Sequence, residues 1–140
     1  MRVNNPILTG FNPDPSIIRV EDTYYIATST FETYPGISIY ESKDLVNFKL
    51  VARPLTENII NMRGNSPSSG VWAPDITYKD GMFYIVFSNM KTWCRGPFKD
   101  TNNFIICSSS IKGPWSKPVY INSSGFDASL FHDDDNKSYF

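Results

Sequence analysis

The chain has 140 residues, enough for one ordinary domain, and a formal net charge of −1. Its lysines and arginines are scattered singly, so the sequence gives no reason to expect a nucleic-acid partner. The longest apolar runs are far shorter than a membrane span requires, so no membrane partner is expected either. Composition therefore favours a soluble globular protein.

The cysteines and the N-terminal residues bear on the cellular compartment. Only Cys94 and Cys107 are present, and two cysteines do not define a disulfide framework. The first residues lack a charged segment followed by an apolar one, so no signal peptide is visible. Both observations favour a cytoplasmic protein with reduced thiols.

The first half of the chain predicts strands rather than helices. Helical periodicity is nearly absent, and short β-branched and aromatic runs lie between glycines and prolines. A turn is expected at 21–23, and the alternation within 37–40 indicates a strand with one solvent-facing side. The runs predict a four-stranded meander with strands at 17–20, 24–28, 37–40 and 48–52.

The second half repeats this course. The Asp80-Gly81 pair is a strong hairpin signal, so 76–79 should pair with 82–88. The third strand is expected at 104–108, and part of the fourth at 119–121. A second four-stranded meander is therefore predicted.

A short motif led by aspartate occurs three times, and each copy precedes an aromatic pair or near-pair. Such repetition indicates stacked copies of one β unit, and propeller blades take about 40–50 residues plus loops. Because blades close in sets of about four to eight, residues 1–140 are expected to form the N-terminal portion of an all-β propeller domain. Blade 1 would cover about 5–60, blade 2 about 70–122, and the start of blade 3 about 125–140. The copies are Asp14-Pro15-Ser16-Ile17, Asp75-Ile76-Thr77-Tyr78 and Asp127-Ala128-Ser129-Leu130.

The leading aspartates are candidate catalytic residues, because copies arranged around an axis bring their carboxylates together, and paired carboxylates hydrolyse glycosidic bonds. Asp14 lies between two prolines that stiffen the backbone, which favours a positioned general base; the alternative is a turn or capping residue. Asp127 has apolar neighbours and needs a partner or a function; a structural hydrogen bond is the alternative. For Asp75, a structural role is favoured over a catalytic one.

Other polar and aromatic residues carry weaker signals. Phe31 and Trp72 are candidate sugar-stacking platforms, and core packing is the alternative for each. The run 133–136 lacks the spacing of a calcium loop, so a solvated hairpin turn is favoured. His132, the only histidine, has no Cys or His partner for a metal and is interpreted as structural. No metal and no cofactor is expected.

Together these segments resemble glycoside hydrolase family 43, and within it the β-xylosidases. The matching segments span nearly the whole chain and are highly specific in combination. They are Gly10-Phe11-Asn12-Pro13-Asp14-Pro15-Ser16-Ile17, Tyr24-Tyr25-Ile26-Ala27-Thr28-Ser29-Thr30-Phe31-Glu32, Ser42-Lys43-Asp44-Leu45-Val46-Asn47, Gly70-Val71-Trp72-Ala73-Pro74 and Ser123-Ser124-Gly125-Phe126-Asp127-Ala128-Ser129-Leu130-Phe131-His132-Asp133.

The resemblance implies a five-bladed β-propeller that cleaves terminal β-1,4-linked xylose from xylo-oligosaccharides with inversion. By motif, Asp14 corresponds to the general base that activates water. Asp127 corresponds to the carboxylate that orients the general acid and raises its pKa. The walls of the pocket for the terminal sugar correspond to Phe31, Trp72 and Phe126. A homo-oligomer of the full-length protein is also an open possibility.

The resemblance also shows what these residues lack. The family's general acid is a glutamate on a later blade, and none of the four glutamates here lies in a matching motif, so the acid is expected beyond Phe140. Two alternatives stay open: an α-L-arabinofuranosidase or arabinanase of the same family, and an inactive fragment or non-catalytic sugar-binding propeller. The glutamates are Glu21, Glu32, Glu41 and Glu57.

Overall fold

The computed structural model describes residues 3–56, 59–92 and 99–140. Residues 1–2, Glu57 and Cys94 lie outside these ranges, whereas Cys107 lies inside them and is a free thiol. The described residues form strands and no helix, so none of them belongs to a helix long and apolar enough to cross a membrane. The strands are β1 (Ser16–Val20), β2 (Thr23–Ser29), β3 (Ile37–Ser42), β4 (Lys49–Ala52), β5 (Gly70–Lys79), β6 (Met82–Thr92), β7 (Asp100–Ser108), β8 (Val119–Asn122), β9 (Phe131–His132) and β10 (Ser138–Tyr139).

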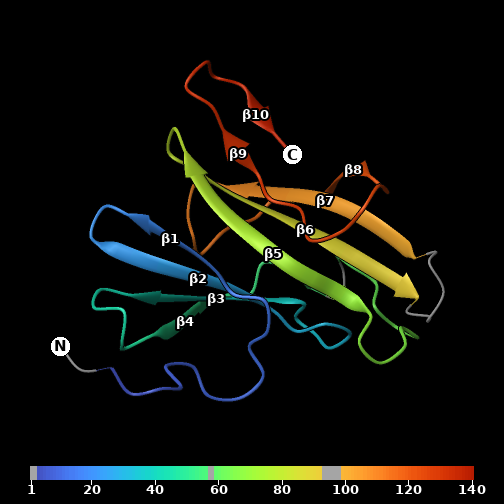
Figure 1. Cartoon of the computed structure of the whole chain (residues 1–140), viewed down its shortest axis with the longest axis horizontal. Helices are drawn as coiled ribbons and strands as arrows, with labels where there is room; N and C mark the ends of the chain where they lie inside the picture. The colour runs from blue at the N-terminus through green and yellow to red at the C-terminus, as the bar shows by residue number, and fades with distance from the viewer. Residues whose placement is uncertain (1–2, 57–58, 93–98) are drawn as a thin grey trace.

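The strands form two antiparallel meanders and one hairpin (Figure 1). Strands β1 to β4 make the first four-stranded sheet in chain order, β5 to β8 make the second, and β9 pairs with β10. Strand β5 lies against β1 and β2, so the first strands of the two sheets meet (Figure 1). The two predicted four-stranded meanders are therefore confirmed.

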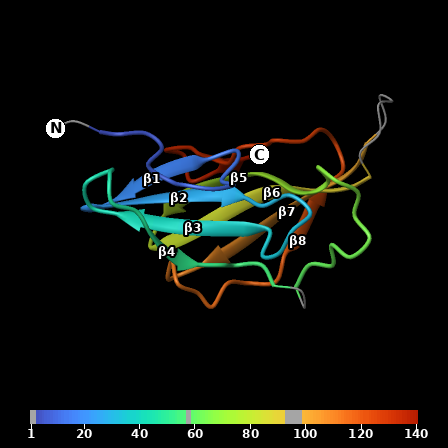
Figure 2. The ribbon, with the colours of Figure 1, turned by 90° about the horizontal axis from the view of Figure 1, so that it is seen from below.

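The core lies between the two sheets; Figure 2, seen from below, shows the first sheet in front of the second. Ile37 and Ile39 of β3 are fully buried, as are Ile76 of β5 and Ile85 of β6. Burial of each such side chain contributes about 1.5–3 kcal/mol. This apolar packing fixes the angle between the sheets, and with it the positions of the loops where the strands begin.

Strand β5 begins earlier than predicted, at Gly70 rather than Ile76. The sequence Ala73-Pro74 argues against a regular strand because proline donates no ladder hydrogen bond. The structure accommodates it with a register shift between Trp72 and Asp75, where Ala73 has a φ of 21°. A β-bulge thus extends the strand through residues that appear to break it.

Strands β6 and β7 are also longer than predicted, extending to Thr92 and starting at Asp100. The predicted turn between β5 and β6 is confirmed. Asp80 and Gly81 both have positive φ, at 52° and 80°, as a type I′ turn requires.

The acidic run 133–136 is the turn of the last hairpin, as predicted. The Asp133 amide donates to the Lys137 carbonyl at 2.9 Å, and Asn136 adopts a φ of 66°. Before the turn, His132 places its Nε2 atom 3.0 Å from the Thr77 hydroxyl and its Nδ1 atom 2.8 Å from the Ser138 hydroxyl. His132 of β9 is thus connected to β5 and to β10, which agrees with its interpretation as a structural residue.

Candidate active site

A cavity of about 270 Å³ lies where the two sheets and the segment before β9 meet. It is open to solvent and carries two carboxylates and two aromatic rings. The structure thus brings together four of the site residues predicted from sequence. The cavity is lined by Asp14, Phe31, Ser68, Trp72 and Asp127.

Asp14 is held at the cavity by its side chain. It adopts a φ of 53°, a conformation that residues other than glycine rarely keep without support. The buried Ser29 hydroxyl donates to Asp14 Oδ2 at 3.2 Å, and the Ser29 amide donates to the Pro13 carbonyl at 3.1 Å. Within the described ranges Oδ1 accepts no hydrogen bond, so this oxygen is free to accept a proton.

Asp127 is held by its backbone. Its φ is 57°, and its amide donates to the Ser88 hydroxyl at 3.3 Å. Partial burial raises the pKa of the Asp127 carboxyl above its usual value, and the nearby charge of Asp14 adds to the rise. The side chain stays substantially exposed, so solvent limits the shift. Asp14 and Asp127 therefore lie close enough for the charge of Asp14 to act on the Asp127 carboxyl.

Asp75 does not line the cavity. Its Oδ1 accepts from the Ser16 hydroxyl and its Oδ2 from the Leu130 amide, both at 2.9 Å. The Ser16 hydroxyl in turn accepts from the Ile76 amide at 3.2 Å. Asp75 therefore connects β1, β5 and the segment before β9, which is a structural arrangement.

The predicted aromatic walls occur as two edge-to-face pairs, each with ring centroids 5.4 Å apart. Phe31 contacts Phe11, and Trp72 contacts Phe126. Phe126 is 49% exposed and is not among the residues that line the cavity; it is next to the cavity through its contact with Trp72. Exposed ring faces beside carboxylates suit the stacking of a sugar ring.

The walls are fixed to each other through the backbone. The Val71 amide donates to the Phe31 carbonyl at 3.0 Å, and the Trp72 indole donates to the Ser68 carbonyl at 2.9 Å. Gly70 has a φ of 87°, and a Cβ there would overlap the Phe31 carbonyl. Only glycine allows this close approach, which brings Phe31 and Trp72 to the same cavity.

None of the glutamates in the described ranges lines the cavity. Glu32 accepts from the Ser68 amide at 3.0 Å, Glu21 lies in the β1–β2 turn, and Glu41 lies in β3. In the same ranges, no three His, Cys, Asp or Glu side chains gather in a way that could hold a metal ion.

Sequence reasoning missed three serines of this site: Ser29, Ser68 and Ser88. Ser29 and Ser88 end the matching stretches Tyr24–Ser29 and Phe83–Ser88, so the repeat itself carried a signal for both. Ser68 lies in the link between β4 and β5, and no motif marks it. Its place at the cavity depends on contacts with Glu32 and Trp72.

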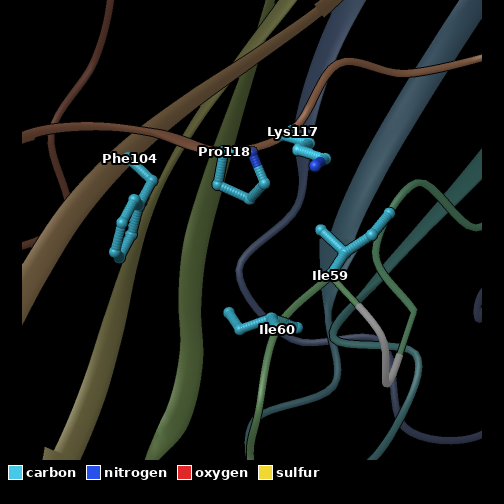
Figure 3. A pocket seen from close by; sticks show the side chains of 5 residues that line it. All are labelled: Ile59, Ile60, Phe104, Lys117 and Pro118. Carbon is cyan, nitrogen blue, oxygen red and sulfur yellow. The ribbon is translucent and has the colours of Figure 1, made fainter.

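A second hollow, of about 320 Å³, lies beside the outer strands of the second sheet (Figure 3). Among the described residues that line it, one is charged, Lys117, and none is a carboxylate. This part of its lining therefore lacks the paired acids found at the first cavity. Its lining residues are Ile59, Ile60, Phe104, Lys117 and Pro118.

Comparison with known proteins shows which family the chain is similar to. The family model described as glycosyl hydrolases family 43 matches residues 3–140. The chain is 56% identical to xylosidase/arabinosidase 43B of Humicola insolens and 52% identical to the β-xylosidase of Bacillus subtilis strain 168. Each alignment covers 99% of this chain and 26% of the relative.

A solved structure gives the same result. The crystal structure of xylan β-1,4-xylosidase from Bacillus halodurans C-125 superimposes with a TM-score of 0.94 at 54% identity, over 98% of this chain and 26% of that one. The solved neighbours are five-bladed β-propellers, which confirms the predicted fold class. The chain spans about a quarter of the length of these relatives.

Proposed function

Because this chain belongs to glycosyl hydrolases family 43, we propose that the full-length protein releases terminal β-1,4-linked xylose from xylo-oligosaccharides, with inversion at the anomeric carbon. The observation that carries the proposal is the meeting of Asp14 and Asp127 in one aromatic-walled cavity. Relatives at 52% and 56% identity, whose names include xylosidase, support this choice of substrate.

Asp14 is the proposed general base. In a single displacement, its carboxylate removes a proton from a water molecule as the water oxygen attacks the anomeric carbon. The bond to the leaving oxygen breaks while a protonated acid donates to that oxygen. Base and acid must stand about 6.5–9.5 Å apart to leave room for the water. The Ser29 hydrogen bond to Oδ2 supports the role by leaving Oδ1 available.

Asp127 is the proposed partner of the general acid. Its carboxylate shares the cavity with Asp14 and interacts with its charge. A carboxylate beside a second acid raises the pKa of that acid and keeps it protonated near neutral pH. The acid itself is proposed to be a glutamate outside residues 1–140, because these residues span about a quarter of the relatives.

Phe31, Trp72 and Phe126 are the proposed walls for the terminal xylose. Their ring faces would stack on the C–H face of the sugar. We place blade 1 at about 5–60, blade 2 at about 70–122 and the start of blade 3 at about 125–140, as the N-terminal portion of the propeller.

The experiment is hydrolysis of xylobiose by the full-length protein, with the product followed by proton NMR. The first-formed xylose is expected as the α anomer; initial appearance of the β anomer would overturn the single displacement. Parallel assays with aryl β-xyloside and aryl α-L-arabinofuranoside test the second candidate, an α-L-arabinofuranosidase. The name xylosidase/arabinosidase of the 56% identical relative favours testing both.

A further inference from the structure

Behind the cavity, four strands of the second sheet carry polar or aromatic side chains along one cross-strand row. Trp72 of β5 is paired with Ser88 of β6, Ser88 with Asn103 of β7, and Asn103 with Asn122 of β8. Directly paired residues of an antiparallel sheet point to the same face. The row thus runs from one wall of the cavity to the start of the loop that carries Asp127.

Hydrogen bonds connect three members of this row, Ser88, Asn103 and Asn122, to one another and to the loop. The Ser88 hydroxyl donates to Asn103 Oδ1 at 2.7 Å, and Asn103 Nδ2 donates to Asn122 Oδ1 at 2.9 Å. Asn103 Nδ2 also lies 3.4 Å from the Ser124 carbonyl and 3.3 Å from the Gly125 carbonyl. The Ser88 oxygen then accepts from the Asp127 amide. The loop 122–127 is therefore bound at both ends by two side chains.

Ser88 and Asn103 are each 1% exposed. Burying a hydroxyl and a carboxamide is unfavourable unless their polar atoms are bonded, so the pair keeps its geometry only with the loop in place. The loop needs such support because Gly125 and Asp127 both adopt left-handed conformations, with φ of 75° and 57°. For a non-glycine residue this conformation persists where the surroundings enforce it.

The first sheet shows that the propeller fold does not require this amide. Ser29 holds the position that Ser88 holds, but its cross-strand partner is Ile37, which is fully buried. Ser29 instead donates to the Asp14 carboxylate. The fold accepts an isoleucine at this place, so the amide of Asn103 serves the loop beside it.

We propose that Ser88 and Asn103 are positioning residues for Asp127: together they fix the backbone of loop 122–127 and hence the direction of the Asp127 carboxylate. The inference rests on the proposed function, in which Asp127 acts on the general acid. The charged groups facing Asp127 are few within the described ranges. Asp14 interacts with it from the segment before β1, and Asp75 of β5 is engaged by Ser16 and Leu130.

The test uses the full-length protein with Ser88→Ala and, separately, Asn103→Ile, which copies the first sheet. For each, kcat on xylobiose should fall about tenfold or more, because small displacements of catalytic groups are costly, while KM changes little. The alkaline limb of the kcat profile should move to lower pH, because a displaced Asp127 no longer keeps the acid protonated. Loss on dinitrophenyl β-xyloside should be smaller, because that leaving group needs little protonation.

Two control variants separate positioning from simple destabilisation. Thr101→Val removes another buried hydroxyl of β7, one that bonds the Met90 sulfur rather than the loop, and should leave both kcat and the pH limb unchanged. Ser29→Ala should lower kcat equally on both substrates, because the base is needed for each. Thermal unfolding of every variant corrects for the folded fraction.

A double-mutant cycle with Asp127→Asn completes the test. In that background Ser88→Ala should have no further effect on kcat. The inference would be overturned if Ser88→Ala still lowered kcat to the same extent in the Asp127→Asn background. It would also be overturned if Ser88→Ala, like Thr101→Val, left kcat and the pH limb unchanged. If the unsubstituted protein hydrolyses neither xyloside, the proposed function fails instead. A crystal structure of the Ser88→Ala protein then decides the positioning: a displaced Asp127 supports it, and an unchanged Asp127 rejects it.

Discussion

The two carboxylates of the cavity are held in opposite ways by equivalent parts of the chain. In the first sheet, Ser29 donates to the carboxylate of Asp14 and so fixes the reacting group itself. In the second sheet, Ser88 accepts from the backbone of Asp127 and leaves its carboxylate unbonded within the described ranges. The same serine position thus restrains a base directly and a modulating group indirectly. The repeat places a serine at the same point of both sheets, and the residues around each serine determine whether it bonds the carboxylate or the backbone of the aspartate.

The third leading aspartate completes the comparison. Asp75 lies in a strand after a bulge, with both oxygens bonded, whereas Asp14 and Asp127 precede their strands with positive φ. Among three sequence-equivalent aspartates, two face a cavity and one connects sheets. Substitutions at each position test this division.

The largest expected effect follows from Asp14→Ala in the full-length protein. Removal of a general base should lower kcat on xylobiose by about 10²–10⁴-fold. Folding should be retained, because the side chain is exposed and its one hydrogen bond among the described residues is to Ser29. Steady-state kinetics with a circular dichroism melt measures both. Asp22→Ala, which removes an exposed carboxylate paired with Lys43, is the control and should keep kcat. Undiminished turnover in Asp14→Ala would refute the base assignment.

A smaller effect, on stability rather than rate, is expected from Asp75→Ala. The change leaves the Leu130 amide and the Ser16 hydroxyl without their acceptor, which costs about 1–3 kcal/mol of unfolding free energy. The kcat of the folded protein should change little. Urea unfolding gives the free energy, and Ser16→Ala, which removes one bond to Asp75 and also the acceptor of the Ile76 amide, should cost a comparable amount. A large loss of kcat at full stability would place Asp75 among the catalytic residues.

The smallest effect concerns pH. The pKa of Asp127 is raised in the folded state from an ordinary value of 3.8, so the folded protein binds its proton more tightly than the unfolded chain. This contribution to stability is present below the unfolded pKa and is lost as pH rises through the folded pKa. Asp127→Asn cannot titrate, so it should become more stable relative to the unsubstituted protein as pH rises through that window. Urea midpoints at pH 3 and pH 7 measure the trend, and a trend of opposite sign would contradict the raised pKa.

Local chemistry made much of the fold predictable. The Asp80-Gly81 turn was readable from two residues, because only a few sequences accept two positive φ values in succession. The early start of β5 was not readable, because it depends on the Phe31–Val71 backbone contact between segments distant in sequence. A short stretch of sequence contains both residues of the turn, whereas the two residues of the backbone contact are 40 positions apart.

The candidate site divides in the same way. The repeat predicted that the three leading aspartates would converge, and the structure brings two of them, Asp14 and Asp127, to one cavity. The repeat could not show that Asp75 lies outside the cavity, because the hydrogen bonds to Asp75 come from residues 55 and 59 positions away. The catalytic roles themselves stay predictions for the full-length protein.

The connections between sheets also bear on how the chain reaches its fold during synthesis. Ser16, two residues after Asp14, bonds to Asp75, and Thr77, two residues after Asp75, bonds to His132, at separations of 59 and 55 residues. Each unit is therefore linked to the next by a hydrogen bond in which the residue that carries the hydroxyl is synthesised before its partner. Domains are made from the N-terminus at about 5–20 residues per second, so the units can dock in order. Such ordered docking limits the time during which any sheet edge stands open to a neighbouring nascent chain.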